Sequence, residues 1–133
     1  MLFLEYPPCS TCKKAKKWLN DNNIVYTDRH IKEEQPSYEE LKHWLEISGL
    51  PVKKFFNTSG MQYRALELKD KLPVMSLEEQ LQLLATDGML VKRPIVVTDT
   101  GNVLIGFKES DGANLLKKRK NSRDHLVTAV SIS

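Results

Sequence analysis

The first third of the chain alternates short apolar runs with one amphipathic segment. Residues 2–5 are mostly apolar, as in a short strand, and residues 10–22 repeat apolar side chains at helical spacing. The face that this helix would bury consists of Ala15, Trp18, Leu19 and Asn22. A second apolar run at residues 24–26 predicts a strand parallel to the first, because a helical crossover joins parallel strands.

Two capping boxes mark helices in the middle of the chain. They are Ser37 with Glu40 and Ser76 with Glu79. In each box the two side chains satisfy exposed amides at the start of a helix. The apolar stripe of the first helix is Tyr38, Leu41, Trp44 and Leu45. We expect a turn at residues 57–60 and helices over residues 37–49, 51–56, 61–71 and 76–88.

The C-terminal part of the pattern returns to strands. Residues 95–98 are β-branched, residues 99–102 favour a turn and residues 103–107 are apolar again, which is typical of a β-hairpin. A last helix is expected at about residues 109–118. The order predicts a thioredoxin-like α/β fold, in which a βαβ half and a ββα half share one mixed sheet. Residues 34–90 would form an inserted helical subdomain.

Composition indicates a single domain with a basic tail. A chain of 133 residues with ordinary apolar and charged fractions is expected to fold as one domain, residues 1–116. Those residues carry 15 basic and 16 acidic side chains, so the formal charge of +3 comes from residues 117–133. The tail has no aromatic residues among its lysines and arginines. A solvated, flexible end is therefore favoured over a nucleic-acid contact.

The chain also lacks the patterns of membrane and exported proteins. No apolar stretch reaches the roughly 18 residues that a membrane span needs. The N-terminus lacks the basic and apolar regions of a signal peptide. We therefore expect a cytoplasmic monomer that binds neither membranes nor nucleic acid directly. In the cytosol its thiols would rest in the reduced state.

The strongest chemical signal is the spacing of the only two cysteines. Cys9 and Cys12 form a C-x-x-C motif at the start of the first predicted helix. Unpaired amides and the helix dipole stabilise a thiolate at that position. We predict that Cys9 is the attacking thiolate and that Cys12, one turn further in, resolves the mixed disulfide. Ser10 and Thr11 would supply hydroxyls and amides near an incoming anion.

Alternative interpretations of these residues stay open. A zinc site usually has four ligands, whereas the three histidines are scattered at positions 30, 43 and 125. Inert core cysteines are common, although a pair placed at a helix start after Pro7 and Pro8 argues against inertness. The lysines at positions 13, 14, 16 and 17 either assist the thiolate or form a solvated face. His30, at the end of the second strand region, is more often structural than catalytic.

A second chemical signal is the Arg93-Pro94 pair. Proline directly before a strand is tolerated because its missing amide falls at the strand start. In thioredoxin-like folds the proline at this point is typically cis and faces the C-x-x-C motif. Arg93 would then direct its guanidinium toward the thiols. The alternative is a surface arginine at a strand end.

Four separated segments resemble the arsenate reductase/Spx regulator family. They are residues 6–15, 56–60 with 63–64, 87–90 and 92–95, and they occur in the family's order within roughly residues 2–116. The resemblance implies that Cys9 is the nucleophile and that Arg93 and Arg64 bind the substrate anion. It also implies that no cofactor is bound, with glutathione, glutaredoxin or thioredoxin as the electron donor.

Two branches of that family imply different functions. Its arsenate reductases place a third arginine after the last strand, where residues 105–108 offer only Lys108, and they lack a counterpart of Cys12. Its Spx-type regulators keep C-x-x-C as a redox switch and bind the RNA polymerase α C-terminal domain. They carry a glycine and acidic residues where this chain has lysines at positions 53 and 54.

We therefore predict an enzyme, a thiol-disulfide oxidoreductase resembling the glutaredoxin-linked arsenate reductases. Its substrate would be a disulfide or a small oxidised or anionic compound. The alternative is an Spx-like regulator that binds RNA polymerase. The predicted substrate-binding residues are Ser10, Thr11, Arg64, Arg93 and Pro94.

Overall fold

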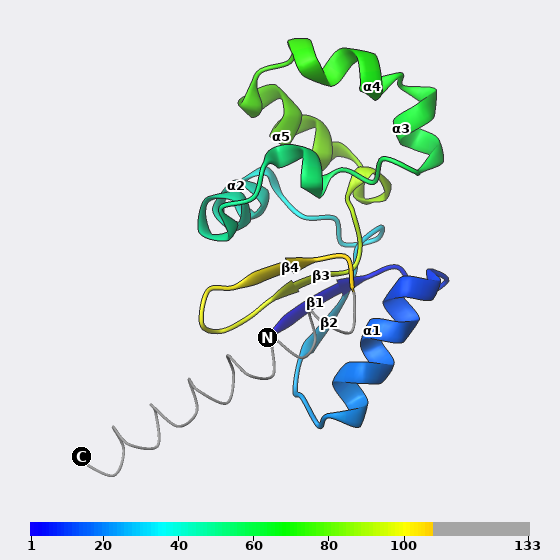
Figure 1. Cartoon of the computed structure of the whole chain (residues 1–133), viewed down its shortest axis with the longest axis vertical. Helices are drawn as coiled ribbons and strands as arrows, with labels where there is room; N and C mark the ends of the chain where they lie inside the picture. Colours follow the sequence, from blue (N-terminus) through cyan, green and yellow to red (C-terminus); the bar gives the residue numbers. More distant parts are fainter. Residues whose placement is uncertain (108–133) are drawn as a thin grey trace, which may run out of the picture.

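A computed structural model describes residues 1–107 and contains a four-stranded mixed sheet (Figure 1). The strands are β1 Leu2–Glu5, β2 Thr27–His30, β3 Ile95–Val97 and β4 Val103–Ile105, in the order β2-β1-β3-β4. β1 and β2 run parallel, whereas β3 is antiparallel to both β1 and β4. The predicted thioredoxin-like α/β fold class is therefore confirmed.

Helix α1, Ser10–Asp21, packs on one face of the sheet and connects the parallel strands (Figure 1). Its apolar stripe and the sheet form a small core of Phe3, Ala15, Leu19, Ile24 and Val96. Successive side chains of β1 point to opposite faces, so Leu4 enters a different core from Phe3. Asn22, predicted on the buried face, instead caps the helix, and its Nδ2 donates to the Trp18 carbonyl at 2.8 Å.

A layer of helices covers the opposite face of the sheet (Figure 1). The α-helices are α2 Tyr38–Ser48, α3 Met61–Ala65, α4 Leu68–Lys71 and α5 Leu77–Thr86. Short 3-10 helices connect them: η1 Val52–Phe55, η2 Leu72–Val74 and η3 Gly88–Leu90. Both predicted capping boxes form, at the starts of α2 and α5. The buried side chains of this layer pack with Leu4, Ile95 and Val103 in the larger core.

The predicted strand at residues 24–26 is wrong. The second strand is β2, three residues later, and its side chains are polar. Ile24 is buried under α1 rather than in a strand, and Val25 is 81 % exposed. Polar residues are tolerated in β2 because it lies at the edge of the sheet, where it pairs on one side only.

Two other predicted elements also have different bounds. The helix expected over residues 61–71 is divided into α3 and α4, because Glu67 has a left-handed backbone with φ of 53°. The strand expected to reach residue 107 ends at Ile105, because Gly106 has φ of 74° and leaves the extended conformation. Local composition gave no sign of the break at Glu67.

Several predictions fall beyond the described residues. They concern the last helix at about 109–118, Lys108, the domain boundary at residue 116 and the tail at 117–133, and they stay predictions. Within residues 1–107, every helix is too short or too polar to traverse a bilayer.

Candidate redox-active site

The two cysteines lie where β1 passes into α1. A tight turn joins the two elements, and the Cys9 amide donates to the Tyr6 carbonyl across it at 2.9 Å. Cys9 is the N-cap residue of α1, with φ of −73° and ψ of 127°, and its thiol is half-buried. Cys12 is one helical turn further on and is fully buried. Both thiols are reduced, and only Cys9 is open to solvent.

The surroundings of Cys9 stabilise its thiolate. Partial burial alone would raise the pKa of the Cys9 thiol. Hydrogen bonds from the Cys12 amide and thiol and from the Thr11 amide, together with the Arg93 guanidinium, outweigh burial and hold the pKa below its usual value. Cys9 therefore carries a larger thiolate fraction at neutral pH than an ordinary cysteine.

The surroundings of Cys12 have the opposite effect. Burial raises the pKa of the Cys12 thiol to about 12, and the neighbouring Cys9 thiol and its charge act in the same direction. The Tyr6 amide, whose nitrogen lies 3.5 Å from Cys12 Sγ, and the Arg93 charge only partly oppose this rise in pKa. Cys12 is therefore a protonated thiol while Cys9 is reduced.

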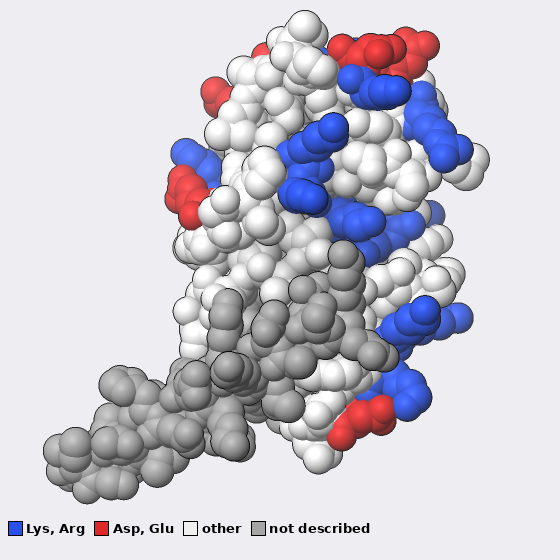
Figure 2. Space-filling view, in the orientation of Figure 1, with Lys and Arg blue, Asp and Glu red and all other residues white. Residues whose placement is uncertain are grey.

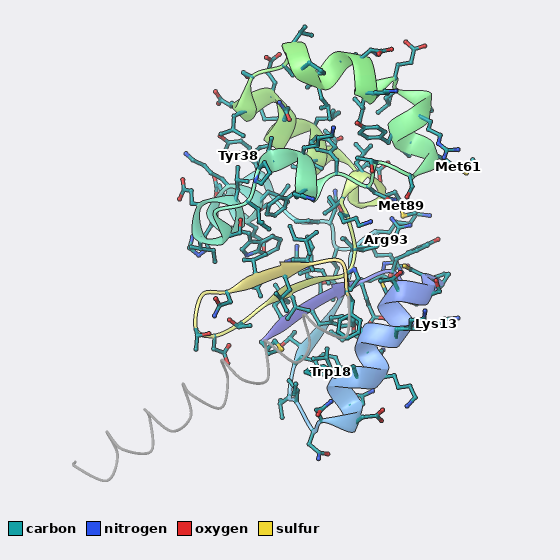
Figure 3. The ribbon with its side chains drawn as sticks, viewed as in Figure 1. Lys13, Trp18, Tyr38, Met61, Met89 and Arg93 are labelled. Atoms are coloured by element: carbon teal, nitrogen blue, oxygen red, sulfur yellow. The ribbon has the colours of Figure 1, made fainter. Side chains whose placement is uncertain are left out.

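Arg93 and Pro94 approach the cysteines from the segment before β3. The peptide bond between them is cis, as predicted. Figure 3 places Arg93 between the helical layer and the first turn of α1, which carries Lys13. The Arg93 Nε and Nη1 atoms are buried and have no hydrogen-bond partner among residues 1–107. Two buried donors beside a thiolate suit a bound anion, which would satisfy them.

The remaining predicted ligands differ in exposure and in their contacts with Cys9. Of the two residues between the cysteines, Ser10 is exposed, and the Thr11 amide contributes a hydrogen bond to Cys9. Arg64 is exposed on α3, where its side chain makes no hydrogen bond or ion pair with any residue that the structure describes. The structure thus brings together Cys9, Thr11, Cys12 and Arg93, with Pro94 adjacent in the chain.

A cluster of charged groups under α1 was missed by the sequence analysis. Glu5 is buried, and Lys16 Nζ lies 3.3 Å from Glu5 Oε2 and 2.8 Å from Asp28 Oδ2. Burial, and then the neighbouring Asp28 carboxylate, raise the pKa of Glu5 to about 7, although Lys16 opposes them. Lys16 is thus paired with carboxylates, which contradicts the interpretation of it as a partner of the thiolate.

Tyr6 is a second residue that the sequence analysis did not assign to the site. The guanidinium carbon of Arg93 lies 5.0 Å from the centroid of the Tyr6 ring. His30 meets the same ring edge-on at 5.9 Å. The only signal in the sequence was the place of Tyr6 between a strand and a C-x-x-C motif.

Among residues 1–107, no cluster of three or more His, Cys, Asp or Glu side chains could hold a metal ion.

Comparison with known proteins gives a family match over most of the chain. The ArsC family model matches residues 4–115. The chain is 58 % identical over 109 residues to the uncharacterized protein YusI of Bacillus subtilis (strain 168), covering 82 % of this chain and 92 % of that one. It is 32 % identical over 119 residues to the regulatory protein MgsR of the same strain, covering 90 % and 92 %.

Regulators and solved structures of the same family are also similar. Identity to the global transcriptional regulator Spx of Staphylococcus aureus (strain Mu50 / ATCC 700699) is 29 % over 114 residues, covering 85 % of this chain and 84 % of that one. A putative ArsC family related protein from Bacteroides fragilis has a TM-score of 0.82 and 61 % identity, covering 86 % and 95 %. A possible arsenate reductase from Streptococcus mutans UA159 has a TM-score of 0.75 and 52 % identity, covering 80 % and 90 %.

Proposed function

Because the chain belongs to the ArsC family, we propose that it is a thiol-disulfide oxidoreductase. Cys9 attacks the substrate, and Cys12 resolves the mixed disulfide that forms on Cys9. The observation that supports this proposal best is the opposite shift of the two thiol pKa values within one helical turn. A thiolate at the surface and a protonated thiol behind it are the two partners that disulfide exchange needs.

In the first step, the Cys9 thiolate attacks one sulfur of a substrate disulfide. A bond forms between Cys9 Sγ and that sulfur, the substrate S–S bond breaks, and the second sulfur leaves as a thiolate that takes a proton from water. Arg93 stands beside Cys9 and would bind an anionic group of the substrate with its unpartnered Nε and Nη1 donors. The glutathione disulfide and its mixed disulfides carry carboxylates of this kind.

In the second step, Cys12 attacks Cys9 Sγ and releases the remaining half of the substrate as a thiol. Formation of the mixed disulfide removes the charge and the thiol of Cys9, which are two of the causes that raise the pKa of Cys12. Cys12 then gives up its proton more readily than in the reduced protein. Two electrons have passed to the substrate, and the protein holds a disulfide between Cys9 and Cys12.

Two electrons from an external thiol complete the cycle. We propose glutathione, glutaredoxin or thioredoxin as the donor, and a cytosolic location where such thiols are kept reduced. Arsenate is the less favoured acceptor. Of the two arginines expected to bind it, only Arg93 stands beside a cysteine in the described part of the chain.

The test is turnover coupled to NADPH, with glutathione and glutaredoxin or with thioredoxin as donor. A glutathione mixed disulfide and arsenate are offered as acceptors in parallel, and Cys9→Ser serves as the blank. Turnover that disappears in Cys9→Ser supports the enzyme, and the preferred acceptor identifies the substrate class. Absence of turnover from a protein whose cysteines still oxidise reversibly overturns the proposed oxidoreductase function.

A redox-switched regulator is the second candidate, because relatives named as regulators align over most of the chain. In that case the oxidation of Cys9 and Cys12 would change the affinity for the RNA polymerase α C-terminal domain, with no turnover. Binding of that domain to the reduced and oxidised protein separates the two functions. Equal and negligible binding in both states excludes the regulator.

A further inference from the structure

We propose that Tyr6 is a positioning residue, whose aromatic ring holds the Arg93 guanidinium in place beside the Cys9 thiol. Through Arg93 the ring sets the reactivity of Cys9, without touching substrate itself. The inference rests on the proposed function in one respect, namely that Cys9 is the attacking thiol.

The sheet register brings Tyr6 and Arg93 together. β1 and β3 pair antiparallel, with Leu2 opposite Val97 and Leu4 opposite Ile95. Continued for two residues beyond the ladder, the same register puts Tyr6 opposite Arg93. Both residues therefore leave the sheet at the same end, where α1 begins.

The Tyr6 ring contacts Arg93 and His30. On one side it meets the Arg93 guanidinium, whose carbon lies 5.0 Å from the ring centroid. On another it meets the His30 ring edge-on, at 5.9 Å and an interplanar angle of 86°. His30 is itself fixed, because its Nδ1 accepts hydrogen bonds at 3.2 Å from the amides of Lys32 and Glu33. The ring is thus supported from the neighbouring strand β2.

Apart from its hydrogen bond to the Cys9 thiol, the Arg93 guanidinium has few polar partners. No carboxylate among residues 1–107 forms an ion pair with Arg93, and its Nε and Nη1 make no hydrogen bond there. An ion pair with a carboxylate is the usual way to fix a guanidinium, and Arg93 has none among these residues. A cation over an aromatic face is attracted by the ring quadrupole, more strongly when the pair is shielded from water. The Tyr6 face is therefore the contact that, together with the Cys9 thiol itself, orients the guanidinium.

The geometry also separates the ring from the rest of the turn. The Tyr6 amide points at Cys12 Sγ, and the Tyr6 carbonyl accepts from the Cys9 amide. Both are backbone interactions, which a substitution of the side chain leaves in place. A change in Cys9 reactivity after substitution of the ring consequently reports on Arg93.

The experiment measures the rate of Cys9 alkylation by iodoacetamide as a function of pH in the full chain. Cys12 is buried, with a pKa of about 12, so the rate at neutral pH reports Cys9. We expect Tyr6→Leu to lower the rate at pH 7 about threefold and to move the profile to higher pH. Tyr6→Phe, which keeps the aromatic face, should match the wild type. In an Arg93→Ala background, Tyr6→Leu should have no further effect.

A volume-preserving variant covers the case in which Tyr6→Leu does not fold. Pentafluorophenylalanine at position 6 keeps the size of the ring but reverses its quadrupole, and should lower the rate as Tyr6→Leu does. An unchanged profile in both variants overturns the proposal, and so does an equal loss in Tyr6→Phe, which would point to the hydroxyl. Alkylation needs no substrate. A shifted profile without turnover therefore supports the role of Tyr6 while the proposed oxidoreductase function fails.

Discussion

The outer and inner sides of the first turn of α1 hold two identical side chains in opposite chemical states. On the outer side, Cys9 is half-buried near Arg93, and its pKa lies below the usual value. On the inner side, Cys12 is fully buried, as is Glu5 at the end of the strand that leads into this turn, and both have raised pKa values, about 12 for the thiol and about 7 for the carboxyl. Only two residues, Ser10 and Thr11, lie between the two cysteines in the sequence.

A position at the start of a helix does not by itself make a cysteine reactive. Both thiols belong to the first turn, where amides are unpaired and the dipole is positive. They differ in solvation and in the distribution of neighbouring charge. Burial dominates the inner side, whereas hydrogen-bond donors and a guanidinium dominate the outer one.

The largest expected effect comes from removing the Cys9 thiol. Cys9→Ser should abolish alkylation by iodoacetamide at pH 7, because the remaining thiol is buried and protonated. Cys12→Ser is the matched control and should still be alkylated, since the Cys9 side chain stays half-exposed. Mass spectrometry of the alkylated protein measures both. Alkylation that survives in Cys9→Ser and vanishes in Cys12→Ser would reverse the roles of the cysteines.

The raised pKa of the buried Glu5 can be tested through the pH dependence of the free energy of unfolding. The pKa of Glu5 is about 7 in the folded protein against 4.5 normally, so the folded state holds this proton more tightly than the unfolded chain does. That contribution to stability is complete below pH 4.5 and is lost as pH rises through 7. Between pH 5 and 8 the free energy of unfolding of the wild type should fall relative to Glu5→Gln, by up to about 3 kcal/mol.

Urea unfolding at several pH values measures this difference. Glu79→Gln is the control, because Glu79 is an exposed capping residue whose pKa is lowered by hydrogen bonds to Ser76, so it does not titrate in this window. A wild type and a Glu5→Gln variant with parallel pH profiles would show that Glu5 is ionised throughout and that the inner side is better solvated than its burial indicates.

On the outer side, removal of the Arg93 guanidinium should weaken the stabilisation of the Cys9 thiolate. Arg93→Ala should raise the pKa of Cys9 and lower its alkylation rate at pH 7 by about tenfold, since a hydrogen bond to a charged group is lost. Arg64→Ala removes an exposed arginine of the helical layer and should leave the rate unchanged. The same pair of variants, compared for binding of glutathione disulfide, tests the proposed anion ligand. Equal rates in Arg93→Ala and wild type would limit Arg93 to a structural role.

The smallest effect is expected from the exposed lysines. Lys13 and Lys14 are exposed and have no ion-pair partner among residues 1–107. Figure 2 shows Lys and Arg side chains in an interrupted run down one side of the molecule. Charges in water act weakly, so Lys13→Ala should change the alkylation rate less than about twofold, and less still in 0.5 M salt. A larger change would place solvent-exposed charges among the causes of Cys9 reactivity.

Features that depend on neighbouring residues could be predicted from the sequence. Both capping boxes form as expected, since each needs only a serine and a glutamate three residues apart. The C-x-x-C motif at the start of α1 follows from such local patterns, and the order of elements along the chain indicated a mixed sheet shared by a βαβ half and a ββα half. The cis peptide before Pro94 was expected from the family resemblance rather than from its neighbours.

Features that depend on distant residues could not be predicted. The apolar run at residues 24–26 has the composition of a strand, but the polar residues 27–30 pair with β1 instead. Ile24 is buried against Ala15 and Leu19 of α1. The Tyr6 contact with Arg93 and the burial of Glu5 beside Lys16 exist only after β1 has paired with its neighbours. Neither arrangement has a periodic signal in the sequence.

The distance along the chain between Cys9 and Arg93 has a consequence during synthesis. A ribosome completes the cysteine pair within the first dozen residues, but adds the guanidinium only at residue 93 of the 133-residue chain. Until β3 pairs with β1, Cys9 lacks the positive charge that Arg93 supplies. The lowered pKa of Cys9 is thus a property that arises only after the C-terminal hairpin has joined the sheet.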